Sequence, residues 1–205
     1  SNGAGGYSIL NIPWSAWGMP DLKRKYVALN TYLEHPFDGK WYGRIDYVWS
    51  HNFGNTEGSV RSDIGQTDVS QTEDWDNAGV MTNSNGSLAN DRRHQLKMVG
   101  YYQVTPEWMI GGNVQILSGT PKTCLSYFGP DQTDPFGYGV AYHFCGPDGT
   151  PAPYGSTGRT PWQEIVSLNV EYRPEWAGKK LAFDVMVYNI FDKQVVTQYR
   201  EGSVS

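Results

Sequence analysis

Two cysteines, Cys124 and Cys145, are the residues of this chain best suited to covalent chemistry. They have 20 residues between them, in a segment rich in glycine and other turn formers. No second cysteine pair accompanies them as a metal site would require, and nearby His143 is expected to be an exposed loop histidine. We therefore predict a disulfide, worth about 3 kcal/mol in loop-closure entropy, in an exported protein. Two free thiols are the alternative.

Aromatic residues crowd the segment between the cysteines. An aromatic-rich loop closed by a disulfide could contact a ligand or form a lid, and the alternative is that its rings pack on one another. The candidate ligand-facing residues are Tyr127, Phe128, Phe136, Tyr138, Tyr142 and Phe144.

An acidic segment offers a second kind of chemistry. Its clustered carboxylates could hold calcium, but their spacing differs from that of an EF-hand loop, so we expect an ordinary solvated loop and assign no metal. The carboxylates are those of Asp63, Asp68, Glu73, Asp74 and Asp76.

Enzyme signatures are absent from the sequence. There is no His-Glu-x-x-His, Gly-x-Ser-x-Gly, phosphate-loop or Cys-x-x-Cys motif. Glu171 and Asp184 could form a glycosidase pair, yet a simple alternation of polar and apolar residues already accounts for both. We expect no enzyme and no cofactor.

That alternation is clearest in residues 41–55, where Trp41, Ile45 and Trp49 fall on one parity and Arg44 and Asp46 on the other. A period of two predicts a β-strand with one apolar and one polar face. Five further segments show the same period, and no long amphipathic helix competes with them. The six predicted strands are residues 25–33, 41–55, 93–104, 108–118, 162–173 and 181–191.

The predicted polar faces carry charges of both signs. Mixed signs suggest cross-strand ion pairs within the wall of a sheet, and direct contact with a passing ligand is the alternative. The residues expected to face a lumen are Arg44, Asp46, Arg93, Lys97, Asn169, Glu171 and Asp184, together with Glu34 and Arg173.

The connections alternate between short and long. Residues 36–40, 105–107 and 174–180 are tight turns, whereas 56–91 and 119–161 are long and rich in Gly, Asn, Ser, Asp and Pro. Short turns on one rim and long loops on the other are typical of an outer-membrane β-barrel. The expected fold is therefore all-β: an antiparallel meander of about six strands forming part of a transmembrane β-barrel, with short periplasmic turns and long extracellular loops.

Composition agrees with this interpretation. Aromatic residues make up 14% of the chain, with 8 Trp and 14 Tyr, which suits the aromatic girdles of a membrane protein. A net charge of -5 argues against a nucleic-acid partner. No run of 18 apolar residues predicts a membrane-spanning helix.

The number of strands suggests a single partial barrel domain over residues 1–205. Bacterial barrels have at least about eight strands, and six would leave two open edges in lipid. We expect residues 1–22 to be the tail of another external loop, and the last strand to run on through Val195, Val196, Thr197 and Tyr199. Residues 1–6 do not resemble a signal peptide, so the N-terminus is expected to lie upstream.

Three motifs carry a family resemblance that covers about residues 23–201. They are Asn90-Asp91-Arg92-Arg93-His94 opening a strand, the run 62–68 with Asp74-Trp75-Asp76 after it, and Asn189-Ile190-Phe191-Asp192 near the end. In this order the sequence resembles the C-terminal barrel of TonB-dependent receptors, in their OmpA-related, Oar-like subgroup.

The resemblance implies a 22-stranded barrel in the bacterial outer membrane, plugged by an N-terminal domain. It also implies import of a scarce ligand with energy passed through a TonB box. The expected partners are outer-membrane lipid, the plug and other strands of the same receptor, the TonB system through that plug, and an unknown ligand. The sequence departs from the family in lacking a plug-like segment, a TonB box and a terminal aromatic residue.

Two alternatives remain open from the sequence. One is a small self-contained outer-membrane barrel of the structural or adhesin kind. The other is a secreted β-sandwich that binds carbohydrate, which would bury the apolar faces between two sheets.

Overall fold

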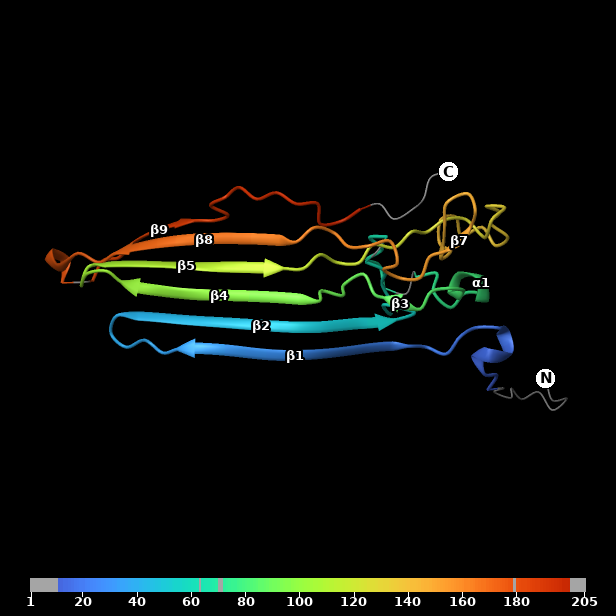
Figure 1. Ribbon diagram of the computed structural model, residues 1–205, viewed down its shortest axis with the longest axis horizontal. Coiled ribbons are helices and arrows are strands. Elements are labelled where there is room, and N and C mark those ends of the chain that lie inside the picture. Colours follow the sequence, from blue (N-terminus) through green and yellow to red (C-terminus); the bar gives the residue numbers. More distant parts are fainter. Residues whose placement is uncertain (1–10, 63, 70–71, 179, 200–205) are drawn as a thin grey trace, which may run out of the picture.

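One antiparallel sheet dominates the computed structural model, which describes residues 11–62, 64–69, 72–178 and 180–199 (Figure 1). Each long strand pairs with the next long strand along the chain, in the order β1-β2-β4-β5-β8-β9. Neighbouring antiparallel strands need only a turn between them, so this is the simplest topology for the predicted pattern. The bounds are β1 (Arg24–His35), β2 (Trp41–Gly54), β4 (His94–Gln103), β5 (Trp108–Leu117), β8 (Gln163–Tyr172) and β9 (Phe183–Val187).

All six predicted strands form, and the all-β class is confirmed. The sheet is open, however, because β1 and β9 lie at its two edges and are not paired with each other. A closed barrel is therefore not formed by the described residues. Three of the central strands have 10 residues each, a length that spans the hydrocarbon core of a bilayer when a strand is tilted.

The short turns lie at one end of the sheet, and the long segments lie at the other (Figure 1). In the β1–β2 turn, the Asp38 carboxylate accepts hydrogen bonds from the backbone nitrogens of Lys40 (2.9 Å) and Trp41 (3.0 Å). Such an Asp side chain mimics a backbone turn and fixes where the next strand begins. The β8–β9 turn contains the 3-10 helix η2 (Glu175–Ala177).

The apolar face of the sheet, defined by Ile45, Met98, Val114 and Val166 in one cross-strand row, is not covered by any other described element. Leu168 stays 44% exposed, and the edge residues Leu33 and Val185 are 71% and 65% exposed. The separation of apolar and polar side chains between the two faces is imperfect, because Val99, Ile165 and Met186 lie on the polar face. A contiguous apolar surface of this kind marks an interaction surface or a membrane surface.

Aromatic side chains border this face at both ends. At the turn end, Trp108 stacks on Tyr172, with ring centroids 4.4 Å apart, and Trp41 stacks on His35 at 3.7 Å. At the loop end, the ring centroids of Trp162 and His94 lie 5.8 Å apart. Trp41 and Trp49 are eight residues apart on β2, which is about 26 Å along a strand.

The hydrophobic core lies outside this sheet. The eight fully buried hydrophobic residues of the described chain all belong to the segments 56–91 and 119–161. These segments also contain four short elements: α1 (Ala78–Met81), β3 (Gly86–Ser87), β6 (Phe144–Cys145) and β7 (Thr150–Pro151). We call the two segments together the cap. Their buried hydrophobic residues are Val80, Met81, Leu88, Leu125, Ala141, Tyr142, Ala152 and Tyr154.

Helix is scarce among the residues that the structure describes. Besides α1 and η2, the described chain contains the 3-10 helix η1 (Trp14–Trp17), which lies in the predicted external tail. Among the residues that the structure describes, no helix has the length and hydropathy to cross a membrane. Residues 1–10 of the expected tail lie outside the described residues.

The last strand is shorter than the sequence predicts. Asn189 adopts a left-handed conformation (φ 49°), and its side chain bonds the backbone nitrogen (3.1 Å) and oxygen (3.2 Å) of Lys193. This turn takes the chain out of regular pairing, although the Ile190 nitrogen still donates to the Val166 oxygen at 2.9 Å. The expected continuation through residues 195–199 was wrong, because they form no strand.

We predict that Asn189→Ala destabilises the fold by about 1 to 2 kcal/mol, because alanine tolerates a positive φ poorly and cannot make either side-chain hydrogen bond. Asn189→Gly keeps the backbone freedom and loses only the bonds, so it should cost about half as much. Urea unfolding followed by tryptophan fluorescence measures both. Equal costs would show that the left-handed backbone does not determine this turn.

Candidate functional site at the loop end of the sheet

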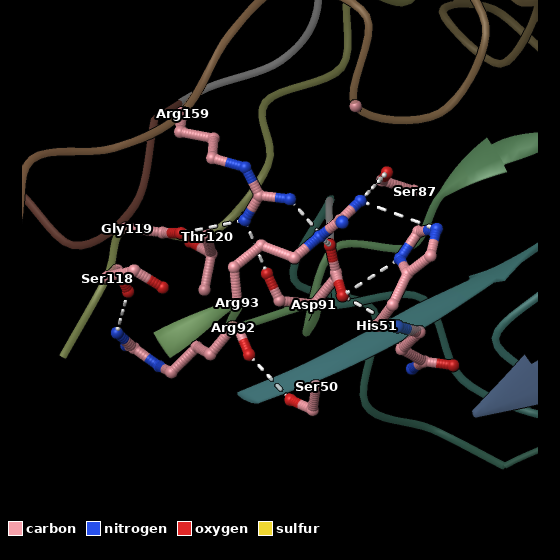
Figure 2. Close-up of polar contacts among 12 residues, drawn as sticks. Ser50, His51, Ser87, Asp91, Arg92, Arg93, Ser118, Gly119, Thr120 and Arg159 are labelled. Carbon is pink, nitrogen blue, oxygen red and sulfur yellow. Dashed lines mark hydrogen bonds and ion pairs between the residues drawn. The ribbon is translucent and has the colours of Figure 1, made fainter. Parts of the chain in front are cut away.

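A buried carboxylate, Asp91, joins the sheet to the cap (Figure 2). It lies just before β4, and its side chain is fully buried. Its Oδ1 atom accepts a hydrogen bond from the backbone nitrogen of Asn52 (2.6 Å) and lies 3.3 Å from Nδ1 of His51. Its Oδ2 atom accepts from Nε of Arg93 (2.7 Å) and Nη2 of Arg159 (2.5 Å). One side chain therefore connects β2, the start of β4 and the second long segment.

Arg159 extends this network along the base of the cap. Its Nη1 atom donates to the backbone oxygens of Asp91 (2.7 Å) and Gly119 (3.0 Å). Gly119 and Thr160 meet where the second long segment begins and ends, and a Cβ atom on Gly119 would lie 1.6 Å from the Thr160 oxygen. The absence of a side chain at Gly119 is thus required for the base of this segment to close.

The neighbouring Arg92 points to the opposite side of the network (Figure 2). Its Nη1 atom donates to the Ser118 oxygen at the end of β5 (2.7 Å), and its own backbone oxygen accepts from Ser50 Oγ (2.6 Å). Burial lowers the pKa of Arg92, although a guanidinium stays charged at any physiological pH. Arg92 therefore links the start of β4 to the end of β5, while Arg93 contacts Asp91 on the other side.

The charge of Asp91 is strongly stabilised in the fold. Burial alone raises the pKa of this carboxyl, but hydrogen bonds from the Asn52 backbone, Arg93, Arg159 and His51 outweigh burial, and the net pKa lies below its ordinary value. Asp91 is therefore ionised at neutral pH. Two arginines against one carboxylate leave the cluster with a net positive charge.

The Cys124–Cys145 disulfide forms, with Cα atoms 5.4 Å apart. It closes a loop whose inner surface packs on the first long segment, where Val80 contacts Ala141 and Tyr142. A disulfide of this span stabilises the fold by about 3 kcal/mol in the loop-closure model. The cap is thus a compact unit with its own core.

Asp134 shapes the tip of this loop. Its carboxylate accepts hydrogen bonds from the backbone nitrogens of Phe136 (3.3 Å), Gly137 (2.9 Å) and Gly139, and from the Tyr142 hydroxyl (2.9 Å). Burial, reinforced by the Asp134 charge, raises the pKa of Tyr142. Tyr142 therefore remains a neutral hydrogen-bond donor.

The six candidate ligand-facing aromatics divide into two groups. Tyr142 is fully buried, and Phe128, Tyr138 and Phe144 pack against the same core. Tyr127 and Phe136 are 39% and 61% exposed. Contact with a ligand remains a prediction, and these last two rings are the ones available for it. His143 was expected to be exposed, but it is fully buried against Tyr154, with ring centroids 4.5 Å apart.

The acidic segment is organised by an arginine. Nη1 of the fully buried Arg61 lies 3.8 Å from carboxylate oxygens of both Glu73 and Asp74, and Asp74 also accepts from Thr56 Oγ1 (2.7 Å). No group of three potential metal-ligating side chains occurs within the described ranges. Asp63, one of the candidate calcium ligands, lies outside them.

Glu34, Arg44, Asp46, Lys97, Asn169, Glu171 and Asp184 share one face of the sheet by strand register, whereas Arg93 and Arg173 lie just outside the paired strands. Arg44 bonds Asp46 on its own strand (2.7 Å) and Glu34 across to β1 (3.3 Å). Lys97 lies opposite Asp46 in register. That this face encloses a lumen remains a prediction, because the sheet is open.

The charges at the turn end of the same face are less completely paired. Glu171 forms an ion pair with Arg173 (2.6 Å) and lies opposite Asp184 on β9. Asn169, two residues earlier on β8, lies against Gly111. Like charges at Glu171 and Asp184 oppose close pairing at this edge of the sheet.

Sequence reasoning missed Arg159 and Arg61, both in the long segments. Neither belongs to a periodic strand pattern, so nothing local marked them as partners of distant carboxylates. A usable signal existed for Asp91 alone, since the run 90–94 was already singled out as a motif.

Comparison with curated proteins finds a stretch of the TonB-dependent transporter Oar of Myxococcus xanthus that is 30% identical over 179 residues. The match covers 86% of this chain. It spans only 16% of the length of that transporter. The chain is therefore similar to one region of a TonB-dependent transporter. No family model matches the sequence, and no solved structure matches it.

The Asp91 cluster of this receptor-related region generates a stability prediction. We expect Asp91→Asn to cost about 2 to 3 kcal/mol, because two arginines lose their counter-charge but are 30% and 31% exposed and so partly screened by water. The cost should appear first as faster protease cleavage within the cap. Asp148→Asn, at an exposed position of the same long segment, is the matched control.

The same variant tests pH dependence. The folded-state pKa of Asp91 lies below the value of about 3.9 expected in an unfolded chain. Its stabilisation is therefore fully present above that pH and is lost as the pH falls through the folded-state pKa. Wild type should lose more stability than Asp91→Asn between pH 6 and pH 3. Parallel losses would rule out a role for this carboxylate.

Proposed function

We propose that this chain forms part of the wall and the external cap of an outer-membrane receptor that takes up a ligand. The apolar face of the sheet would meet lipid, the polar face would line the lumen, and the cap would face the outside of the cell. Similarity to a TonB-dependent transporter supports this role, and energy would come from the TonB system through a plug domain.

One observation carries the proposal. The sheet exposes a continuous apolar face bordered by aromatic rings at both ends, while the buried core lies wholly in the cap. In water such an exposed apolar face would be unstable. In a bilayer, the lipid tails would take the place of a packed layer of protein. Aromatic girdles at both interfaces are typical of outer-membrane barrels.

The open edges support a larger assembly. The outer edges of β1 and β9 have no strand partner among the described residues. In hydrocarbon, each unpaired backbone group costs several kcal/mol, so further strands of the same receptor are expected to pair with both edges. A secreted β-sandwich is the alternative, and it would need a second sheet to cover the apolar face.

In this proposal, the cap captures the ligand. Phe136 and Tyr127 are exposed on a loop that a disulfide and the Asp134 carboxylate hold in place. Rigid aromatic groups bind at a low entropic cost. The chain would bind and pass a ligand without acting as an enzyme.

A pair of substitutions on β8 tests the membrane assignment. Leu168→Arg places a charge in the middle of the apolar face and should cost about 2 to 4 kcal/mol in lipid. Asn169→Arg, one residue on, points to the polar face and should be tolerated. Urea unfolding in phospholipid vesicles measures both, and equal losses would contradict the facing assignment.

The size and gel behaviour of the native protein test the receptor assignment. We expect outer membranes to yield a band several times larger than the 23.0 kDa of this chain, migrating differently before and after boiling. The shift arises because a closed barrel resists detergent until it is heated. A water-soluble 23 kDa species would overturn the proposal.

A further inference from the structure

A polar pocket lies on the polar face at the loop end of the sheet, beside the Asp91 cluster. Its volume is about 450 Å³. Tyr26 and Asn52 are directly opposite each other in the β1–β2 register, and Arg24 and Ser50 are on the same face. The pocket is lined by Arg24, Tyr26, Ser50, Asn52 and Asn90.

Arg24 brings an unused positive charge to this pocket. It makes no ion pair or side-chain hydrogen bond with any residue that the structure describes. Its Nη1 atom lies 3.1 Å from where a Cβ on Gly58 would stand, so the bare backbone at Gly58 leaves room for the guanidinium. A guanidinium with free donors is suited to binding a carboxylate through two parallel hydrogen bonds.

The two asparagines bring a paired donor and acceptor. Asn52 Nδ2 donates to Asn90 Oδ1 at 2.5 Å, which leaves Asn52 Oδ1 and the Asn90 amide nitrogen without a partner among the described residues. The Asn52 backbone is fixed by its bond to Asp91. Vicinal hydroxyl groups, which donate and accept at once, match this pair.

Tyr26 adds an aromatic surface. It is 63% exposed and lies on the polar face of β1, on the same side as Arg24 and Asn30. An exposed ring beside polar groups can stack on the apolar face of a sugar ring while hydroxyl groups bond the neighbouring amides.

The surroundings favour a negative ligand. None of the lining residues is acidic. Behind the pocket, the single negative charge of Asp91 is offset by Arg93 and Arg159, and Arg92 donates to a backbone oxygen. The pocket is therefore positive within a chain whose net charge is -5.

We propose that this pocket binds an acidic sugar, with its carboxylate on Arg24, its ring on Tyr26 and its hydroxyl groups on Asn52 and Asn90. This rests on the proposed function, because the pocket meets a ligand only if the polar face lines a lumen below the cap. The pocket would be an intermediate binding site for a ligand that the cap has captured and that then passes along the polar face of the sheet.

Galacturonate and galactose are suitable probes, since they differ only in the carboxylate at C6. Binding of each is measured by calorimetry to the full-length protein, purified in detergent from outer membranes. We expect galacturonate to bind at least tenfold more tightly than galactose. Arg24→Gln should abolish this preference, and Tyr26→Ala should weaken both sugars by a similar factor.

Lys25→Gln is the matched control, because it removes the same charge one residue away on the opposite face. It should leave the preference unchanged, and Arg24→Lys should keep part of it. Equal binding of the two sugars by wild type, or equal loss with Lys25→Gln, would overturn the proposal. So would acetate or phosphate competing as well as galacturonate, because the pocket would then be a general anion site.

Heat-modifiability of each variant separates this inference from the proposed function. Variants that migrate as folded barrels but show no sugar preference refute the pocket alone. A wild-type protein that is not an outer-membrane barrel refutes both.

Discussion

Apart from its two outer edges, the sheet satisfies its backbone hydrogen bonds strand to strand, yet one of its faces has no apolar layer to pack against. In a soluble protein, burial of that face supplies most of the free energy of folding. Here Ile45, Leu168 and Val185 remain 40%, 44% and 65% exposed. The fold therefore depends on an apolar solvent or partner for this face. The aromatic rings at both strand ends mark where such a solvent would give way to water.

The cap is stabilised differently from the sheet, because it holds two long segments in place without a regular strand pairing. It does so with a small core around Val80 and Tyr142, a disulfide, and carboxylates that gather donors. Asp91 connects this unit to the sheet, so the cap and the strand ends form one structure. In the proposed function, the sheet lies in lipid and the cap in water, with the boundary between them at the loop-end aromatic rings.

The strands were predictable because alternation is a local signal, and each of the six needs only its own residues to show it. The last strand was overestimated because Asn189 breaks pairing through a left-handed turn, which apolar periodicity does not register. Apart from its disulfide, the cap was not predictable: Arg159 reaches Asp91 from 68 residues away, and His143 is buried against Tyr154. Side chains that satisfy distant carboxylates carry no periodic signature, so only the fold reveals them.

The polar face divides into halves with different electrostatic character. In its middle, Arg44 is satisfied by Glu34 and Asp46, and such pairs stiffen a wall while offering a ligand little unpaired charge. Nearer the cap, Arg24 has no carboxylate partner among the described residues, and the cluster behind it is positive. Leaving a cation unpaired gains nothing for stability, whereas it favours recognition of an anion. The distribution of unpaired charge therefore supports the proposed ligand contact near the cap, whereas the paired charges in the middle of the face stabilise the sheet.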